Sequence, residues 1–111
     1  MKKIGIGLIW VFCMFAMNHV AAADEGETIF KSQGCMACHK NQSTSKVNPS
    51  LTEISMAYQG KVQQLIKYLQ GESDAIVKPE KANLMRRYVE KTKNLSDSDR
   101  KALAEYILSQ Q

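Results

Sequence analysis

The feature that most constrains this chain is the stretch Cys35-Met36-Ala37-Cys38-His39, in which two cysteines stand three positions apart and a histidine follows the second. The chain has 111 residues, of which 44% are hydrophobic. This is enough for one compact domain and too little for two. A domain of this size buries only a modest core, so we expect the cysteines to provide a covalent or metal staple.

The first 23 residues have the pattern of a secretory signal peptide. Two lysines follow the first methionine, an apolar run covers residues 4–17, and Ala21 and Ala23 supply the small residues that signal peptidase requires. We predict cleavage after Ala23, which leaves residues 24–111 as one domain in the periplasm. The alternative is an uncleaved membrane anchor, because residues 4–23 approach the length that spans a bilayer.

Removal of the signal peptide changes the charge balance. The whole chain has 15 Lys and Arg residues and 11 Asp and Glu residues; without residues 1–23 it loses two lysines and no acid, which leaves 13 basic residues against 11 acidic ones. No basic stripe interleaved with aromatic residues indicates nucleic acid. The run Arg86-Arg87, with Lys91 and Lys93 nearby, is either a solvated face or a docking patch for an acidic partner protein.

Capping boxes predict three helix starts, and no segment shows the alternation typical of strands. The boxes are Asp24-x-x-Glu27, Ser50-x-x-Glu53 and Ser96-x-x-Asp99. We expect the helices that start at Asp24 and Ser50 to end at Gly34 and Gly60. The helix that starts at Ser96 is expected to pack through Leu103, Tyr106 and Ile107.

Further helix signals lie between these boxes. In residues 61–71 the apolar positions fall on one helical face and Gly71 ends the pattern. Residues 73–94 predict a short helix flanked by loops, because Pro79 suits a first turn whereas Asn83 and Asn94 favour interruption. The polar, turn-rich residues 40–50 predict a surface loop.

Three chemistries compete for Cys35 and Cys38. A redox disulfide of the thioredoxin type usually follows a strand in a strand and helix pattern, which is missing here. A zinc site needs four ligands, whereas the exported domain offers only these cysteines and His39. The third is covalent attachment of haem, for which C-x-x-C-H is the signature. Cysteines three apart project from one side of a helical turn, where both thiols can form thioethers with the haem vinyl groups and the histidine can bind the iron.

Together these features resemble the small monohaem class I c-type cytochromes of bacteria. The resemblance covers residues 24–111. It rests on GCMACHK, NPSL, EISMAYQGKVQQLIKYLQGE, a methionine before the last helix, and LSDSDRKALAEYILS. It implies an all-α class I cytochrome c fold, in which several short helices surround one covalently attached haem c and the N- and C-terminal helices cross. The residues that match the crossing positions of the family are Gly26, Phe30, Leu103 and Tyr106.

The resemblance also implies the ligands of the haem iron. His39 is expected on one face, with its ring hydrogen-bonded to the carbonyl of Pro49. A methionine thioether is the usual ligand on the other face. Met36 lies in the attachment loop and Met56 falls in the second helix, so Met85, in the segment that the family places across the distal face, is the predicted ligand. A packing role for Met85 is the alternative.

The resemblance implies a one-electron carrier rather than an enzyme. With His39 and Met85 both bound, the iron has no vacant position and can only change its oxidation state. We expect a monomer that shuttles electrons between respiratory redox proteins, binds no nucleic acid and does not stay in the membrane after cleavage. If Met85 does not bind, the open iron could bind small gases or reduce peroxide. If the N-terminal segment is retained, the domain could be a tethered subunit of a larger respiratory complex.

Overall fold

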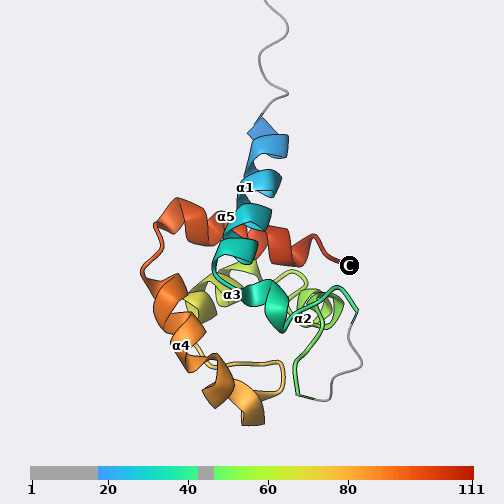
Figure 1. Cartoon of the computed structure of the whole chain (residues 1–111), viewed down its shortest axis with the longest axis vertical. Coiled ribbons are helices and arrows are strands. Elements are labelled where there is room, and N and C mark those ends of the chain that lie inside the picture. Colours follow the sequence, from blue (N-terminus) through green and yellow to red (C-terminus); the bar gives the residue numbers. More distant parts are fainter. Residues whose placement is uncertain (1–17, 43–46) are drawn as a thin grey trace, which may run out of the picture.

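The computed structural model describes residues 18–42 and 47–111. Within these residues the chain is all-helical and has no strand, which confirms the predicted fold class (Figure 1). The helices are α1 (Asn18–Ser32), α2 (Leu51–Ala57), α3 (Val62–Leu69), α4 (Ala82–Lys93) and α5 (Asp97–Leu108), with 3₁₀ turns η1 (Cys35–Ala37) and η2 (Pro79–Lys81).

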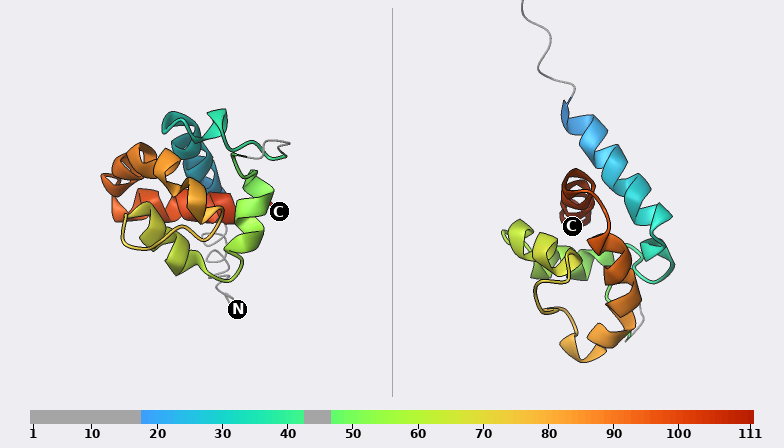
Figure 2. Two further views of the ribbon diagram at one scale, coloured as in Figure 1. Left: turned by 90° about the horizontal axis from the view of Figure 1, so that it is seen from below. Right: turned by 90° about the vertical axis from the view of Figure 1, so that its left-hand side faces the viewer.

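The first and last helices cross at close range, as predicted. A β-carbon at Gly26 would lie 2.7 Å from the Cβ atom of Tyr106 and would also collide with the carbonyl oxygen of Ala102. Only glycine therefore allows α1 to approach α5 this closely. The rings of Phe30 and Tyr106 pack beside the crossing, with centroids 5.4 Å apart and planes tilted by 55°. Figure 2 shows α1 passing obliquely beside α5, which is seen end-on in the right-hand view.

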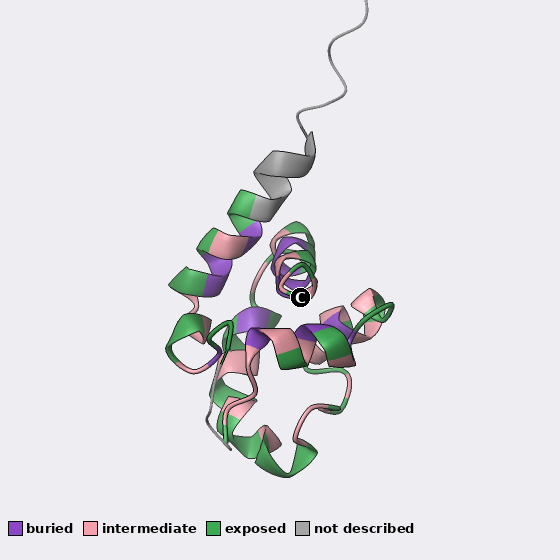
Figure 3. Ribbon diagram, turned by 90° about the vertical axis from the view of Figure 1, so that its right-hand side faces the viewer, coloured by how far each residue is buried: buried purple, intermediate pink, exposed green. Residues whose placement is uncertain are grey.

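The hydrophobic core forms where α1, α2, α3 and α5 meet. Its buried members are Ile29, Phe30, Leu51, Tyr58, Leu65, Leu69, Ala102, Leu103, Ala104 and Ile107. Helix α4, which is described over its whole length, adds no residue to this cluster. Figure 3 shows the same division, since buried positions gather around the crossing helices and the far end of the molecule is mostly partly buried or exposed.

Two of the predicted helix caps are present. The hydroxyl oxygen of Ser50 accepts a hydrogen bond from the backbone N–H of Glu53 at 3.1 Å, and Ser96 does the same for Asp99 at 3.1 Å. Each bond satisfies an N–H group that has no partner inside the helix. The starts of α2 and α5 are therefore determined locally, as the sequence predicted.

The end of α3 also follows the prediction. Gly71 adopts a left-handed φ of 76°, its N–H donates to the carbonyl of Tyr68 at 2.9 Å, and the N–H of Glu72 donates to the carbonyl of Lys67 at 2.8 Å. This pair of bonds is a Schellman motif, which closes a helix where glycine can take the left-handed conformation. The chain then turns away toward η2.

Two predicted boundaries are wrong. Helix α1 begins at Asn18, so Asp24 lies inside it and the capping box has no free helix start to cap. Helix α4 is 12 residues long, rather than the short helix expected within residues 73–94. Asn83 does not interrupt this helix because its side-chain oxygen accepts a hydrogen bond from Arg86 at 3.2 Å, one turn later.

Two other predictions fall partly outside the described residues. Residues 1–17 of the predicted signal peptide lie outside them, as do residues 43–46 of the predicted surface loop. None of the helices in the part of the chain that the structure describes is long and apolar enough to cross a bilayer.

Candidate functional site

The cysteine motif lies in a tight turn at the end of α1. Gly34 takes a left-handed φ of 80°, which glycine adopts without strain, and this turn redirects the chain into η1. The backbone N–H groups of Cys38 and His39 both donate to the carbonyl of Cys35, at 3.3 and 2.9 Å. Because a 3₁₀ turn has three residues per turn, it aligns positions 35 and 38 along one side. Both thiols are free and half-buried.

The histidine of the motif is buried, with 7% of its surface exposed. Its Nδ1 atom lies 2.8 Å from the carbonyl oxygen of Pro49, which is the contact that the sequence led us to expect. A carbonyl oxygen can only accept, so Nδ1 of His39 carries the hydrogen. In the neutral ring the free lone pair is therefore on Nε2, as in a histidine that binds a metal through this atom.

Local structure holds the Pro49 carbonyl in place. The segment after the motif is tied to the start of α2, because the N–H of Leu51 donates to the carbonyl of Lys40 at 2.8 Å. The hydroxyl of Thr52 donates to the carbonyl of Asn41 at 3.0 Å. These bonds close the loop on both sides of the proline, so His39 meets a fixed acceptor.

The methionine expected opposite the histidine comes from the first turns of α4. The Sδ atom of Met85 lies 3.5 Å from Nε2 of His39. In the tautomer with the hydrogen on Nδ1, both of these atoms are acceptors, so neither donates a hydrogen bond to the other. Two acceptor atoms this close to each other are suited to bind one cation together. The other methionines of the described domain do not line this site, and Met36 and Met56 are 40% and 64% exposed.

A cavity of about 770 Å³ surrounds these groups. This volume is within the usual range of roughly 300–1,000 Å³ for small-molecule and cofactor sites. The motif residues Cys35, Cys38 and His39 lie on its wall, together with Pro49 and Met85. The rest of the wall includes the core residues Phe30, Leu51, Tyr58, Leu65, Leu69, Leu103 and Ile107. The cavity therefore offers two thiols and two facing donor atoms inside an apolar shell.

These residues fit haem c with one adjustment. A metal bound by both atoms would form bonds of about 2.0 Å to nitrogen and about 2.3 Å to sulfur, on the scale that zinc sites show. The 3.5 Å between His39 Nε2 and Met85 Sδ is close to but shorter than the sum of these lengths, so a small movement would let both atoms hold the same metal. Because Met85 is on a helix outside the hydrophobic core, this small movement does not disturb the core packing.

Burial governs the electrostatics of the cavity wall. It raises the pKa of the Cys35 thiol, while the positive charge of Lys91 acts in the opposite direction. Burial also raises the pKa values of the phenols of Tyr58 and Tyr68. Burial therefore favours the neutral forms of all three groups. These groups add no charge to the apolar wall of the cavity.

The basic run of α4 is on the surface of the described domain. Arg86, Arg87 and Lys91 are exposed. The guanidinium of Arg87 and the ammonium of Lys91 each lie 5.4 Å from the centre of the Tyr88 ring, within the range of a cation–π contact. This arrangement is compatible with a solvated face and with a docking patch alike. Tyr88, which also lines the cavity, was not identified from the sequence.

Sequence reasoning also missed a buried arginine. Arg100 is 5% exposed and belongs to α5. The spacing does indicate that Arg100 is buried. It precedes Leu103, Ala104 and Ile107 by three, four and seven residues, which places it on the core face of the helix. A charged residue at such a position needs buried partners.

An all-helical domain that brings a C-x-x-C-H turn and an opposing methionine to one apolar cavity has the features of a small c-type haem protein. The model of the family Cytochrome c matches residues 23–111. The chain is also 30% identical over 113 residues to cytochrome c-551 of Stutzerimonas stutzeri, with 98% of each chain covered. The protein belongs to the cytochrome c family, as a small class I member.

Membership of this family identifies the cofactor and the general activity. The protein binds haem c covalently, with its iron, and the family indicates an electron carrier. Members of the family are generally not enzymes. The zinc and thioredoxin interpretations of the motif are therefore replaced by haem attachment.

Proposed function

We propose that the protein is a periplasmic one-electron carrier that shuttles electrons between respiratory redox proteins. Cys35 and Cys38 form the thioethers to haem c, and His39 and Met85 bind its iron. The observation that supports this proposal most strongly is the pair of acceptor atoms, His39 Nε2 and Met85 Sδ, that face each other at 3.5 Å inside the cavity.

Haem c, when bound, supplies a one-electron couple, and the chain's own residues adjust it. The Pro49 carbonyl holds the imidazole of His39 in one tautomer and increases its electron donation. The thioether of Met85 is soft and favours the reduced state, which raises the potential. The apolar wall keeps water away from the site. With two side-chain ligands present in both oxidation states, little has to move when an electron is exchanged.

Replacement of the distal methionine tests the ligand assignment. The ferric protein should be low-spin and show the weak red charge-transfer band of sulfur ligation, and the ferrous protein should resist carbon monoxide. Met85→Ala should abolish the band, admit carbon monoxide and lower the potential. Met56→Ala is the matched control, because Met56 is largely exposed. If wild type already binds carbon monoxide and Met85→Ala changes nothing, the iron is open and the gas-binding alternative replaces the carrier.

Extraction tests the attachment residues. After denaturation of the exported protein in acid and extraction with an organic solvent, the red colour should stay with the polypeptide. In a Cys35→Ala/Cys38→Ala variant the colour should enter the solvent, because no thioether can form. His39→Ala should prevent stable assembly, since the iron loses its anchor on the proximal side. A normal low-spin spectrum in His39→Ala would contradict the ligand assignment.

We also propose that residues 1–23 are removed on export and that residues 24–111 form the mature domain, a monomer that docks transiently with its donors and acceptors. The signal-peptide pattern of residues 1–23, with Ala21 and Ala23 before Asp24, supports this boundary. The intact mass of the periplasmic protein should equal residues 24–111 plus one haem. A protein that keeps residues 1–23 and stays in the membrane fraction indicates the anchored alternative.

A further inference from the structure

Helix α4 is attached to the rest of the domain in an unusual way. None of its residues belongs to the hydrophobic core or packs against it as a partly buried apolar residue. Thr92 is the one buried residue among its 12, and no side chain caps its N-terminal end. The helix that carries Met85 is therefore held by something other than core packing.

One face of α4 is turned toward the domain. Met85, Tyr88, Val89 and Thr92 recur at intervals of three, four and seven residues, which places them on a single helical face. All four are buried or partly buried, whereas the residues between them are exposed. Met85 and Thr92 are separated by about 10 Å along the helix axis, at 1.5 Å per residue.

The C-terminal end of this face is pinned by two side chains. The hydroxyl of Thr92 donates a buried hydrogen bond of 2.7 Å to the carbonyl of Leu69, at the end of α3. The same hydroxyl lies 3.1 Å from the carbonyl of Val89 in its own helix. The bond to Leu69 therefore joins α4 to a helix that does contribute to the core.

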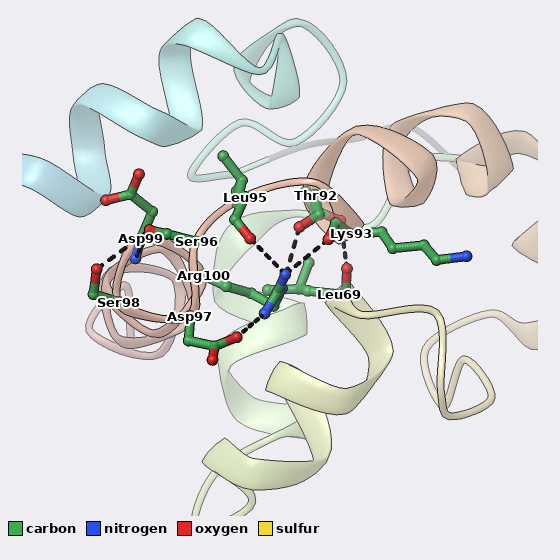
Figure 4. A network of polar contacts seen from close by, with 9 residues as sticks. All are labelled: Leu69, Thr92, Lys93, Leu95, Ser96, Asp97, Ser98, Asp99 and Arg100. Atoms are coloured by element: carbon green, nitrogen blue, oxygen red, sulfur yellow. Dashed lines mark hydrogen bonds and ion pairs between the residues drawn. The ribbon is translucent and has the colours of Figure 1, made fainter.

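Arg100 completes this attachment from α5. Its Nε atom donates to the carbonyl of Thr92 at 3.1 Å, and its Nη2 atom donates to the carbonyls of Lys93 and Leu95 at 2.8 and 2.7 Å. Its Nη1 atom pairs with the exposed carboxylate of Asp97 at 2.9 Å. Figure 4 shows these carbonyl groups around the guanidinium of Arg100. A buried positive charge at a helix C-terminus satisfies carbonyls that have no partner inside the helix.

We propose that Thr92 and Arg100, here called the α4 anchor, are positioning residues for the distal ligand. They hold the C-terminal end of α4 against α3 and α5, so that the rigid helix presents Met85 to His39. The inference rests on the proposed function, in which Met85 binds the iron. It adds that the strength of this ligation depends on hydrogen bonds at Thr92, which lies about 10 Å from Met85 along the axis of α4.

Imidazole provides the test, because it competes with a methionine for ferric haem iron and its binding is followed by absorbance. Thr92→Val removes the hydroxyl and preserves the shape of the side chain. We expect the apparent Kd for imidazole to fall roughly tenfold, which is the equilibrium change that the loss of one buried hydrogen bond produces. Thr92→Ser keeps the hydroxyl and should restore most of the wild-type Kd.

Arg100→Gln should lower the apparent Kd in the same direction. Lys101→Gln, which removes an exposed positive charge from the next position of α5, should leave it unchanged. Equal effects of Arg100→Gln and Lys101→Gln would mean that charge, rather than the anchor, affects the ligand.

Two further measurements distinguish a positioning role from a general loss of stability. In urea, Thr92→Val should lose the charge-transfer band at a lower concentration than the helical circular dichroism signal, with a wider gap than in wild type. In a Met85→Ala background, Thr92→Val should not alter imidazole affinity, because no methionine competes. If Met85→Ala abolishes the band and Thr92→Val leaves the wild-type Kd and band unchanged, the anchor is refuted and the ligand assignment stands. If Met85→Ala keeps the band, the proposed function itself fails.

Discussion

The crossing of α1 and α5 and the helix α4 are two regions of one small domain that are held by different forces. At the crossing, Phe30 is 1% exposed, Leu103 and Ala104 are fully buried, and Gly26 allows backbone contact. Helix α4 is as long as α5, yet Thr92 is its one buried residue. The first region is held by apolar packing, and the second by a few polar contacts at its C-terminal end.

This difference separates the two ligands of the proposed iron site. His39 follows a turn that continues from α1, and its partner Pro49 lies two positions before the first residue of α2, so both belong to the part of the domain built on the core. Met85 belongs to α4 and reaches the site across the cavity. We infer that the proximal half of the site is formed by the fold itself, whereas the distal half also depends on the α4 anchor and the bound haem.

The largest expected difference comes from the same substitution made in both regions. Leu103→Ala removes a fully buried side chain of α5 and should lower the free energy of unfolding by about 2–5 kcal/mol. Leu84→Ala changes a side chain of α4 that is 59% exposed but lines the cavity, and should cost about 1 kcal/mol or less. Urea denaturation of the haem-loaded proteins measures both values. Similar losses in the two variants would contradict the division between the regions.

The helix crossing itself is tested by adding a single methyl group. Gly26→Ala places a β-carbon against Tyr106 and the Ala102 carbonyl, so we expect a loss of about 1–3 kcal/mol in the free energy of unfolding. Thr28→Ala, at an exposed position of the same helix, is the control and should have an effect within about 0.5 kcal/mol. A stable Gly26→Ala protein would show that the helices can separate without cost.

Hydrogen exchange should sharpen the comparison without any mutation. Amides of α5 at Leu103 and Ala104 should exchange only through global unfolding, because these residues are at the centre of the core. Amides of α4 around Met85 should exchange through openings of lower free energy. The measurement is native-state exchange of the haem-loaded protein at several urea concentrations. Equal opening free energies for both helices would indicate that the domain opens as one unit.

The smallest effect concerns alkaline pH and the phenol of Tyr68 on α3. Burial raises its pKa in the folded protein, so the unfolded chain ionises first, near pH 10. The stability that Tyr68 contributes is therefore present below about pH 10 and is lost as the pH rises through the folded pKa. Tyr68→Phe, which cannot ionise, should lose less stability between pH 8 and pH 11, as measured by urea midpoints. Identical losses in both proteins would exclude Tyr68 as a cause.

Several helix boundaries could be predicted from short stretches of sequence. The caps at Ser50 and Ser96 and the glycine that ends α3 were predicted correctly, because each depends on a few consecutive residues. The start of α1 was not, because the chain before Asp24 continues the helix. The length of α4 was underestimated, because an Asn83 side chain that bonds one turn ahead does not break a helix.

The sequence by itself determined the attachment turn and the face of α5 that packs on α1, whereas the contact between Pro49 and His39 was implied by the family resemblance. Only the tertiary structure decided that Met85 Sδ faces His39 Nε2, since these residues are 46 positions apart. It also decided that Arg100 is buried among the carbonyls of Thr92, Lys93 and Leu95. The physical reason is that spacing within one helical turn is set by local backbone geometry, whereas a contact between distant residues depends on how all the helices between them pack.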